Sequence, residues 1–145
     1  MNVNEKGTLG LIEVIRDLSK KGYECFTPLH DYSAVDLIVM NEEYKTIRLQ
    51  IKYRESYRDK ITVDFKTTVS GKSVPINQNA IDGWAVYCPE INQVIYVSKN
   101  EVDLNKKGFA FRFKPAGNQV NDNKEKLKLY YEYGSVDEWF KSAPC

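Results

Sequence analysis

Residues 44–54, YKTIRLQIKYR, decide the fold of this chain. Across residues 46–54, polar and apolar side chains alternate without a break. The apolar set is Ile47, Leu49, Ile51 and Tyr53, and the polar set is Thr46, Arg48, Gln50, Lys52 and Arg54. A period of two predicts a β-strand with one face in the core and the other face accessible. Taken alone, this pattern is typical of an ordinary amphipathic strand with a solvated polar face.

The preceding apolar run, residues 34–40 (AVDLIVM), predicts an interior strand that carries one carboxylate, Asp36. Residues 41–43 make a turn, so residues 34–54 are expected to form a hairpin. A buried, ionised carboxylate is costly unless it is paired, hydrogen-bonded or bound to a metal. Because Gln50 and Lys52 share a face of the next strand, we expect these two side chains and Asp36 to converge.

A carboxylate with neighbouring oxygen donors suits Mg²⁺, which binds through one or two carboxylates together with substrate phosphate. A metal at Asp36 would polarise a scissile phosphate and lower the pKa of a bound water. Lys52 could orient the attacking water or stabilise the developing negative charge. The structural alternative is a buried Asp36–Lys52 ion pair that only fixes the hairpin.

The rest of the chain predicts one α/β (α+β) domain over residues 1–145, with a mixed central sheet flanked by helices. An apolar arc predicts a helix over residues 8–21, with Gly22 following its C-terminal end. Ser135 is expected to cap a short helix over 136–142 with Glu138 in a capping box, and 127–133 is either strand or helix. Further strands are predicted at 23–29, 61–69, 84–88, 93–97 and 109–114, and loops at 70–79 and 115–126.

Composition narrows the classes of protein. Apolar residues make up 42% and charged residues 28%, as in a folded soluble protein. No apolar run approaches the ~20 residues of a membrane span, and the N-terminus lacks the pattern of an export signal, so a cytoplasmic protein is expected. The three cysteines have no metal-ligand spacing, and a single histidine, His30, argues against histidine zinc sites and hydrolase triads.

Charge is unevenly distributed along the chain, although the net charge is only +1. Residues 44–60 contain two acidic residues, Glu55 and Asp59. The basic residues of this segment are Lys45, Arg48, Lys52, Arg54, Arg58 and Lys60. A local basic face beside a metal site would suit a polyanion, and a solvated charged surface is the alternative.

The pattern D-(x13)-Q-x-K after an N-terminal helix resembles the PD-(D/E)xK nuclease superfamily, with Gln50 in place of an acidic residue. More narrowly, roughly residues 5–103 resemble the group I intron-encoded PD-(D/E)xK homing endonucleases. The similar segments are EKGTLG, KKGYE, TPL, VDLIV, LQIKYR, IDGWAVYCPE and VIYV. The resemblance implies a restriction-endonuclease-like core, Mg²⁺ or another divalent cation, and a double-strand break in a long DNA target. It also implies a homo-oligomer, either a dimer or a tetramer.

Carried over residue by residue, the resemblance makes Asp36 the metal-binding aspartate, Gln50 the variant motif position and Lys52 the catalytic lysine. The chain departs from the family twice. Val35 stands where the family has proline, and Leu11 stands where the helix pattern G-x-x-G-E has glutamate. Glu13 is near but lies on the wrong helix face. Leu11 is either tolerated or marks an inactivated variant that still binds DNA, and our hypothesis is the second.

Polar and basic side chains along and after residues 46–54 are candidates for contacts with double-stranded DNA. They are Arg48, Tyr53, Arg54, Arg58, Lys60, Lys66, Lys72, Asn77 and Gln78. Asn77 and Gln78 could read adenine and Lys72 guanine, while simple solvation remains open for each. The sequence therefore predicts a site-specific homing endonuclease. A catalytically silent DNA-binding variant, and a junction resolvase or restriction-type nuclease, are the alternatives.

Overall fold

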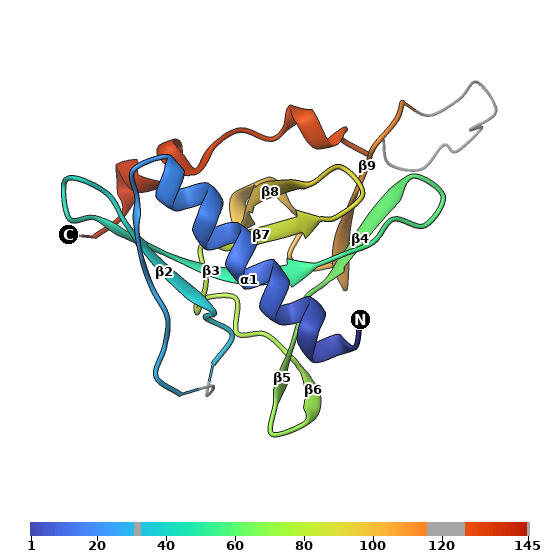
Figure 1. Ribbon diagram of the computed structural model, residues 1–145, viewed down its shortest axis with the longest axis horizontal. Coiled ribbons are helices and arrows are strands. Elements are labelled where there is room, and N and C mark those ends of the chain that lie inside the picture. Colours follow the sequence, from blue (N-terminus) through green and yellow to red (C-terminus); the bar gives the residue numbers. More distant parts are fainter. Residues whose placement is uncertain (31–32, 116–126, 145) are drawn as a thin grey trace.

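The computed structural model describes residues 1–30, 33–115 and 127–144. A five-stranded mixed sheet with the order β1-β2-β3-β7-β8 forms the centre, and helix α1 (Val3–Lys20) lies across it (Figure 1). The strands of this sheet are β1 (Glu24–Phe26), β2 (Leu37–Met40), β3 (Thr46–Tyr53), β7 (Gly83–Cys88) and β8 (Gln93–Ser98). The predicted fold class, an α+β fold with a mixed central sheet and flanking helices, is confirmed.

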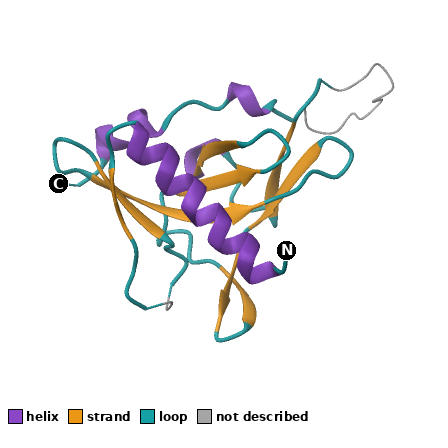
Figure 2. Ribbon diagram, in the orientation of Figure 1, coloured by secondary structure: helices purple, strands orange, loops and turns teal. Residues whose placement is uncertain are grey.

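Two small two-stranded sheets and three short 3-10 helices complete the described fold (Figure 2). One sheet pairs β4 (Lys60–Asp64) with β9 (Gly108–Arg112), and the other pairs β5 (Lys66–Val69) with β6 (Lys72–Pro75). The 3-10 helices are η1 (Lys99–Glu101), η2 (Tyr130–Glu132) and η3 (Val136–Ser142). None of the helices in these ranges has the length and apolar character that a bilayer span requires.

Strand β3 is the middle strand of the central sheet. It runs antiparallel to β2, where Leu37 opposes Leu49, and parallel to β7, where Gln50 lies beside Trp84. The inward side chain of Leu49 belongs to a buried cluster that includes Val14 of α1. Trp84 belongs to a second buried cluster with residues of β4 and β9. The strand that we expected to be half-buried is therefore held between the two clusters of the core.

The helix and the hairpin follow the sequence prediction closely. Residues 34–54 contain the antiparallel pair β2–β3. Helix α1 starts earlier than the predicted residue 8, because Asn2 caps it by accepting a hydrogen bond from the Glu5 N–H at 2.9 Å. The helix ends as predicted, and Gly22 follows with a φ of 89°. That left-handed conformation is one that glycine adopts without steric cost.

The segment after residue 60 differs from its prediction. The expected strand over 61–69 is two strands, β4 and β5, which are separated by the buried Phe65. The expected loop over 70–79 contains strand β6, which pairs with β5 as a hairpin. Ser70 and Gly71 have φ values of 51° and 80°, and two consecutive positive φ angles are what a two-residue hairpin turn of type I′ requires. The Ser70-Gly71 dipeptide is a turn signal that the sequence prediction did not use, because the polar content of the segment favoured a loop.

The C-terminal predictions were partly correct. Ser135 caps η3 over the predicted residues, but the helix is 3-10 and Glu138 pairs with Lys141 at 2.7 Å. The segment left open as strand or helix contains η2, and the predicted strand over 109–114 is β9. Residues 116–126 of the predicted second loop lie outside the described residues, so that prediction stays one.

Candidate active site

A cavity of about 500 Å³ lies beside the polar face of β3, and its lining brings the three predicted catalytic side chains together. Helix α1, strand β3, the end of β4 and the β5–β6 hairpin supply its walls. The lining residues are Val3, Lys6, Gly7, Asp36, Gln50, Ile51, Lys52, Tyr53, Arg54, Asp64, Lys66, Thr67, Thr68 and Ser73. The convergence predicted for Asp36, Gln50 and Lys52 is therefore present in the structure.

Asp36 lies directly before β2, where the chain joins the sheet. Its backbone N–H donates to the Leu49 carbonyl at 2.9 Å, and its Oδ2 accepts a hydrogen bond from the Ile51 N–H at 2.8 Å. These two contacts, both with β3, fix the half-buried carboxylate at the edge of the cavity. The hydrogen bond from the Ile51 N–H gives the Asp36 carboxylate the partner that a charge in this apolar run requires.

Gln50 is the buried polar residue of the site, with only 2% of its surface exposed. Its Oε1 accepts a hydrogen bond from Trp84 Nε1 at 3.0 Å, and its Nε2 donates to the Lys66 carbonyl at 3.4 Å. Because an indole N–H can only donate, it must face the amide oxygen, and this determines which way the amide points. Trp84 and Lys66 thus set the orientation of the variant motif residue.

Lys52 has a largely buried side chain that points to the start of β5. Its Nζ donates to the Lys66 carbonyl at 2.8 Å and to Asp64 Oδ1 at 3.2 Å. Burial lowers the pKa of Lys52 below its ordinary value, while the charge of Asp64 opposes this by favouring the ammonium form. Lys52 forms a salt bridge with Asp64, and the charge of Asp36 also favours the ammonium form of Lys52, more weakly than Asp64 does.

Asp64 is a residue of the site that the sequence prediction missed. It ends β4 with about half of its side chain exposed, and its Oδ1 also lies 3.8 Å from Arg54 Nη2. The alternation of the strand contained a usable signal. Ile61 and Val63 point into the core, so Asp64 belongs to the outward set of the same strand.

Six of the nine predicted DNA-contacting residues line the cavity or are exposed on the strands and turns after it. Tyr53, Arg54 and Lys66 line the cavity. Arg58 and Lys60 are exposed at the β3–β4 connection and the start of β4, and Lys72 is exposed on β6. Arg58 and Lys60 lie near the start of β4, whereas Lys66 and Lys72 belong to the β5–β6 hairpin that follows its other end.

The remaining three, Arg48, Asn77 and Gln78, have structural partners away from this cavity. Arg48 Nη2 lies 3.3 Å from Asp82 Oδ1, and its Nη1 donates to the Asn79 carbonyl at 2.9 Å. Asn77 Oδ1 accepts from the Asn79 N–H at 3.0 Å. Gln78 Nε2 donates to the Leu104 carbonyl at 2.9 Å. These contacts fix the loop that leads into β7, so the structure does not bring the three residues to the candidate site.

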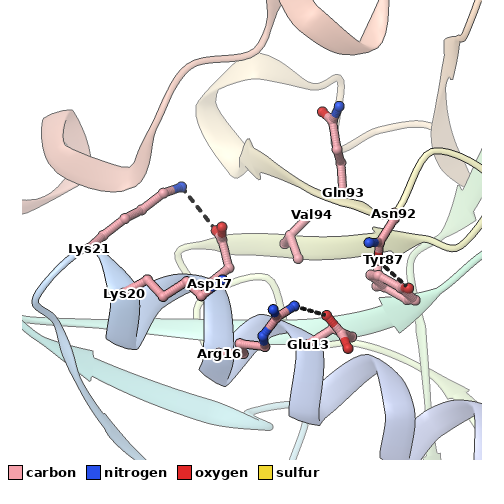
Figure 3. A pocket seen from close by; sticks show the side chains of 9 residues that line it. All are labelled: Glu13, Arg16, Asp17, Lys20, Lys21, Tyr87, Asn92, Gln93 and Val94. Atoms are coloured by element: carbon pink, nitrogen blue, oxygen red, sulfur yellow. Dashed lines mark hydrogen bonds and ion pairs between the residues drawn. The ribbon is translucent and has the colours of Figure 1, made fainter.

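Leu11 lines a neighbouring cavity of about 580 Å³ that Asp36 and Ile51 also border. A longer, charged side chain at residue 11 would therefore share a cavity with Asp36. Glu13 lines a different cavity beside Tyr87, and its carboxylate lies 3.6 Å from Arg16 (Figure 3). The sequence expectation about the two helix faces is thus correct in geometry: residue 11 borders the cavity of Asp36, and Glu13 faces elsewhere.

The donors present suit a weakly held divalent cation. Within the described ranges there is no group of three or more His, Cys, Asp or Glu side chains able to hold a metal. Asp36 offers a carboxylate, and the Gln50 amide oxygen keeps a lone pair beyond the one that accepts from Trp84. Mg²⁺ often uses one carboxylate and completes its shell with water and substrate phosphate, so this donor set is compatible with it.

Comparison with known proteins gives two findings. The profile of a family described as PD-(D/E)XK endonuclease matches residues 1–132. The fold is similar to that of a bacterial homing endonuclease, I-Ssp6803I, with a TM-score of 0.67 and 18% sequence identity. That likeness covers 92% of this chain and 88% of the other. Curated protein sequences give no significant match.

Proposed function

The chain belongs to the PD-(D/E)XK endonuclease family, and from this premise we propose that it is a homing-type endonuclease that breaks both strands of a specific DNA target. The observation that carries the proposal is the convergence of Asp36, Gln50 and Lys52 on one open, polar cavity. We further propose that it acts as a homo-oligomer, because two symmetry-related copies would place one active site on each DNA strand. The proposed location is the cytoplasm.

Asp36 would hold the divalent cation, with the Gln50 amide oxygen as a second donor. When bound, Mg²⁺ would supply Lewis-acid polarisation of the scissile phosphate and an activated water. Asp36 is suited to this task because its contacts with the backbone of β3 hold the carboxylate in place before any substrate arrives. Such preorganisation lowers the reorganisation that the reaction requires.

Lys52 would stabilise the negative charge that develops on the phosphate. Its ammonium group is held by the Lys66 carbonyl and by Asp64, at the wall of the cavity. A fixed cation in a partly desolvated site interacts more strongly with a phosphate than a solvated one does. Arg54 and Lys66, which line the same cavity, would bind the flanking phosphates of the duplex.

Cleavage of a supercoiled plasmid that carries the target selected from a randomised duplex library, in the presence and absence of Mg²⁺, tests the proposal. We expect metal-dependent conversion to linear DNA, and loss of at least about 100-fold in rate for Asp36→Asn and for Lys52→Ala. Asp137→Asn, an exposed substitution on η3, is the matched control and should retain the parent rate. Equal rates for Asp36→Asn and the control would contradict the role of Asp36. A strong preference for a four-way junction over linear duplex would indicate a resolvase.

A second candidate, a DNA-binding protein without cleavage activity, is favoured by Leu11. The site has few carboxylates, and residue 11 borders the cavity where another would reach Asp36. This candidate predicts tight, salt-dependent binding to duplex DNA with no nicking at any Mg²⁺ concentration. Fluorescence anisotropy with a labelled duplex, run beside the plasmid assay, separates it from an active nuclease.

A further inference from the structure

The β5–β6 hairpin stands apart from the central sheet. It forms its own two-stranded sheet, and in Figure 1 it projects from the body of the molecule beyond the N-terminal end of α1. At its base, the Phe65 N–H donates to the Lys107 carbonyl and the Phe65 carbonyl accepts from the Ile76 N–H. The hairpin is therefore anchored at one end, and most of its residues are exposed.

The composition of this segment suits a polyanion. Residues 65–81 contain no aspartate or glutamate, although the chain has 20 acidic residues. The exposed side chains of the hairpin include Lys66, Thr68, Ser70, Lys72 and Ser73. Ammonium and hydroxyl groups of this kind can bond to phosphates and to base edges.

The register of the hairpin places two of these groups side by side. Thr68 is directly opposite Ser73, and directly opposed residues of an antiparallel pair share a face. Both residues, with Lys66, also line the cavity that holds Asp36 and Lys52. That face of the hairpin begins at the candidate active site, and Lys72, which is opposite Val69, lies on the other face beside the turn.

The hairpin is tied directly to the catalytic strand. The carbonyl of Lys66, the first residue of β5, accepts hydrogen bonds from both Lys52 Nζ and Gln50 Nε2. A duplex whose phosphate reached Lys52 would therefore present its neighbouring base pairs to the hairpin.

From this placement we infer that the β5–β6 hairpin is a ribbon that enters the major groove and reads the base pairs beside the cleaved phosphate. The inference rests on the proposed function. A major groove about 12 Å wide admits a two-stranded β-ribbon. Four residues of strand span about 13 Å at about 3.3 Å per residue, which corresponds to about four base pairs at about 3.4 Å each. The hairpin therefore reads one block of about four consecutive base pairs.

Selection from a randomised duplex library, with Ca²⁺ in place of Mg²⁺, tests the inference by binding alone. The parent should select a motif, and footprinting should place the hairpin block next to the position that is cleaved when Mg²⁺ is restored. Ser73→Ala and Lys72→Gln should each weaken base preference within about four adjacent positions, by about fivefold or more, and leave the rest of the motif intact. Ser142→Ala and Lys141→Gln, exposed on η3, are the matched controls and should select the parent motif.

Each other outcome has a distinct meaning. If Ser73→Ala and Lys72→Gln both select the parent motif, or lose affinity equally for all sequences, the hairpin is at most a phosphate contact and the inference is overturned. A parent protein that selects no motif overturns the inference together with site-specific recognition. The parent protein could select a motif that the hairpin variants change, and yet never cleave DNA with Mg²⁺. That result supports the inference, and only the proposed nuclease activity fails.

Discussion

Replacing Gln50 by leucine should destabilise the protein by about 1–3 kcal/mol, although leucine is apolar and the position is buried. The substitution removes the acceptor of the Trp84 indole N–H, which is bonded to Gln50 Oε1 at 3.0 Å. Trp84 is fully buried, so water cannot replace the lost partner. Leaving a buried donor unsatisfied costs about 1–3 kcal/mol. The longer bond from Gln50 Nε2 to the Lys66 carbonyl, at 3.4 Å, contributes less.

Urea unfolding followed by tryptophan fluorescence and circular dichroism measures this loss. For a chain of this size, about 2 kcal/mol corresponds to a fall in Tm of roughly 4–8 °C. Adding Trp84→Phe completes a double-mutant cycle, which should give a coupling energy of about 1–2 kcal/mol between the two side chains.

The reasoning is refuted if Gln50→Leu is as stable as the parent, or if the cycle gives additive effects. Either result would mean that the indole N–H finds another partner, so that Trp84 does not set the orientation of the amide. In that case Gln50 could rotate freely, and its suitability as an oxygen donor beside Asp36 would lose its structural basis.

Three further predictions concern residue 11, Lys52 and a glycine of β7. Leu11→Glu should lower the Mg²⁺ concentration for half-maximal plasmid cleavage by about tenfold, because it adds a carboxylate at the cavity that Asp36 borders. If the cleavage rate does not rise, the hypothesis that Leu11 inactivates the enzyme is contradicted. Burial lowers the folded-state pKa of Lys52 below 10.5, so the unfolded chain binds more protons between the two values. The free energy of unfolding of the parent, relative to that of Lys52→Met, should therefore rise with pH in that interval, as urea midpoints would show. Gly83→Ala should cost more than about 2 kcal/mol, since its Cβ would lie 2.4 Å from the Val97 carbonyl oxygen, whereas Gly7→Ala on α1 has open space and should be neutral or stabilising.

The local part of the site could be predicted from sequence because a hairpin is a local structure. Alternation along β3 placed Gln50 and Lys52 on one face, and the short turn brought Asp36 beside them. When two paired strands are neighbours in the chain, the period of the apolar residues and the length of the turn determine which side chains share a face. The hairpin brings these three side chains together, whereas α1, β4 and the β5–β6 hairpin supply the other walls of the cavity.

The partners of those side chains could not be predicted, because they come from distant parts of the chain. Trp84 reaches Gln50 through the parallel pairing of β3 with β7, and no residue pattern specifies which strand completes a sheet. Asp64 and the Lys66 carbonyl reach Lys52 because the chain breaks at Phe65 between β4 and β5. Phe65 lies between β4 and β5 and packs against Trp84 of β7 and Phe109 of β9. The break therefore depends on elements that are distant in the chain.

The structure also changes the meaning of the glutamine at the variant motif position. A carboxylate at residue 50 could accept from Trp84 but could not donate to the Lys66 carbonyl, whereas the amide does both. The amide therefore links the core at Trp84 to the first residue of the β5–β6 hairpin, and Lys52 makes a second link to the same carbonyl. Gln50 thus connects the candidate site to the hairpin without adding a negative charge beside Asp36. Since Leu11 brings no charge to the cavity that Asp36 borders, we expect cation binding at this site to depend more on the phosphate of a bound duplex than on the protein alone.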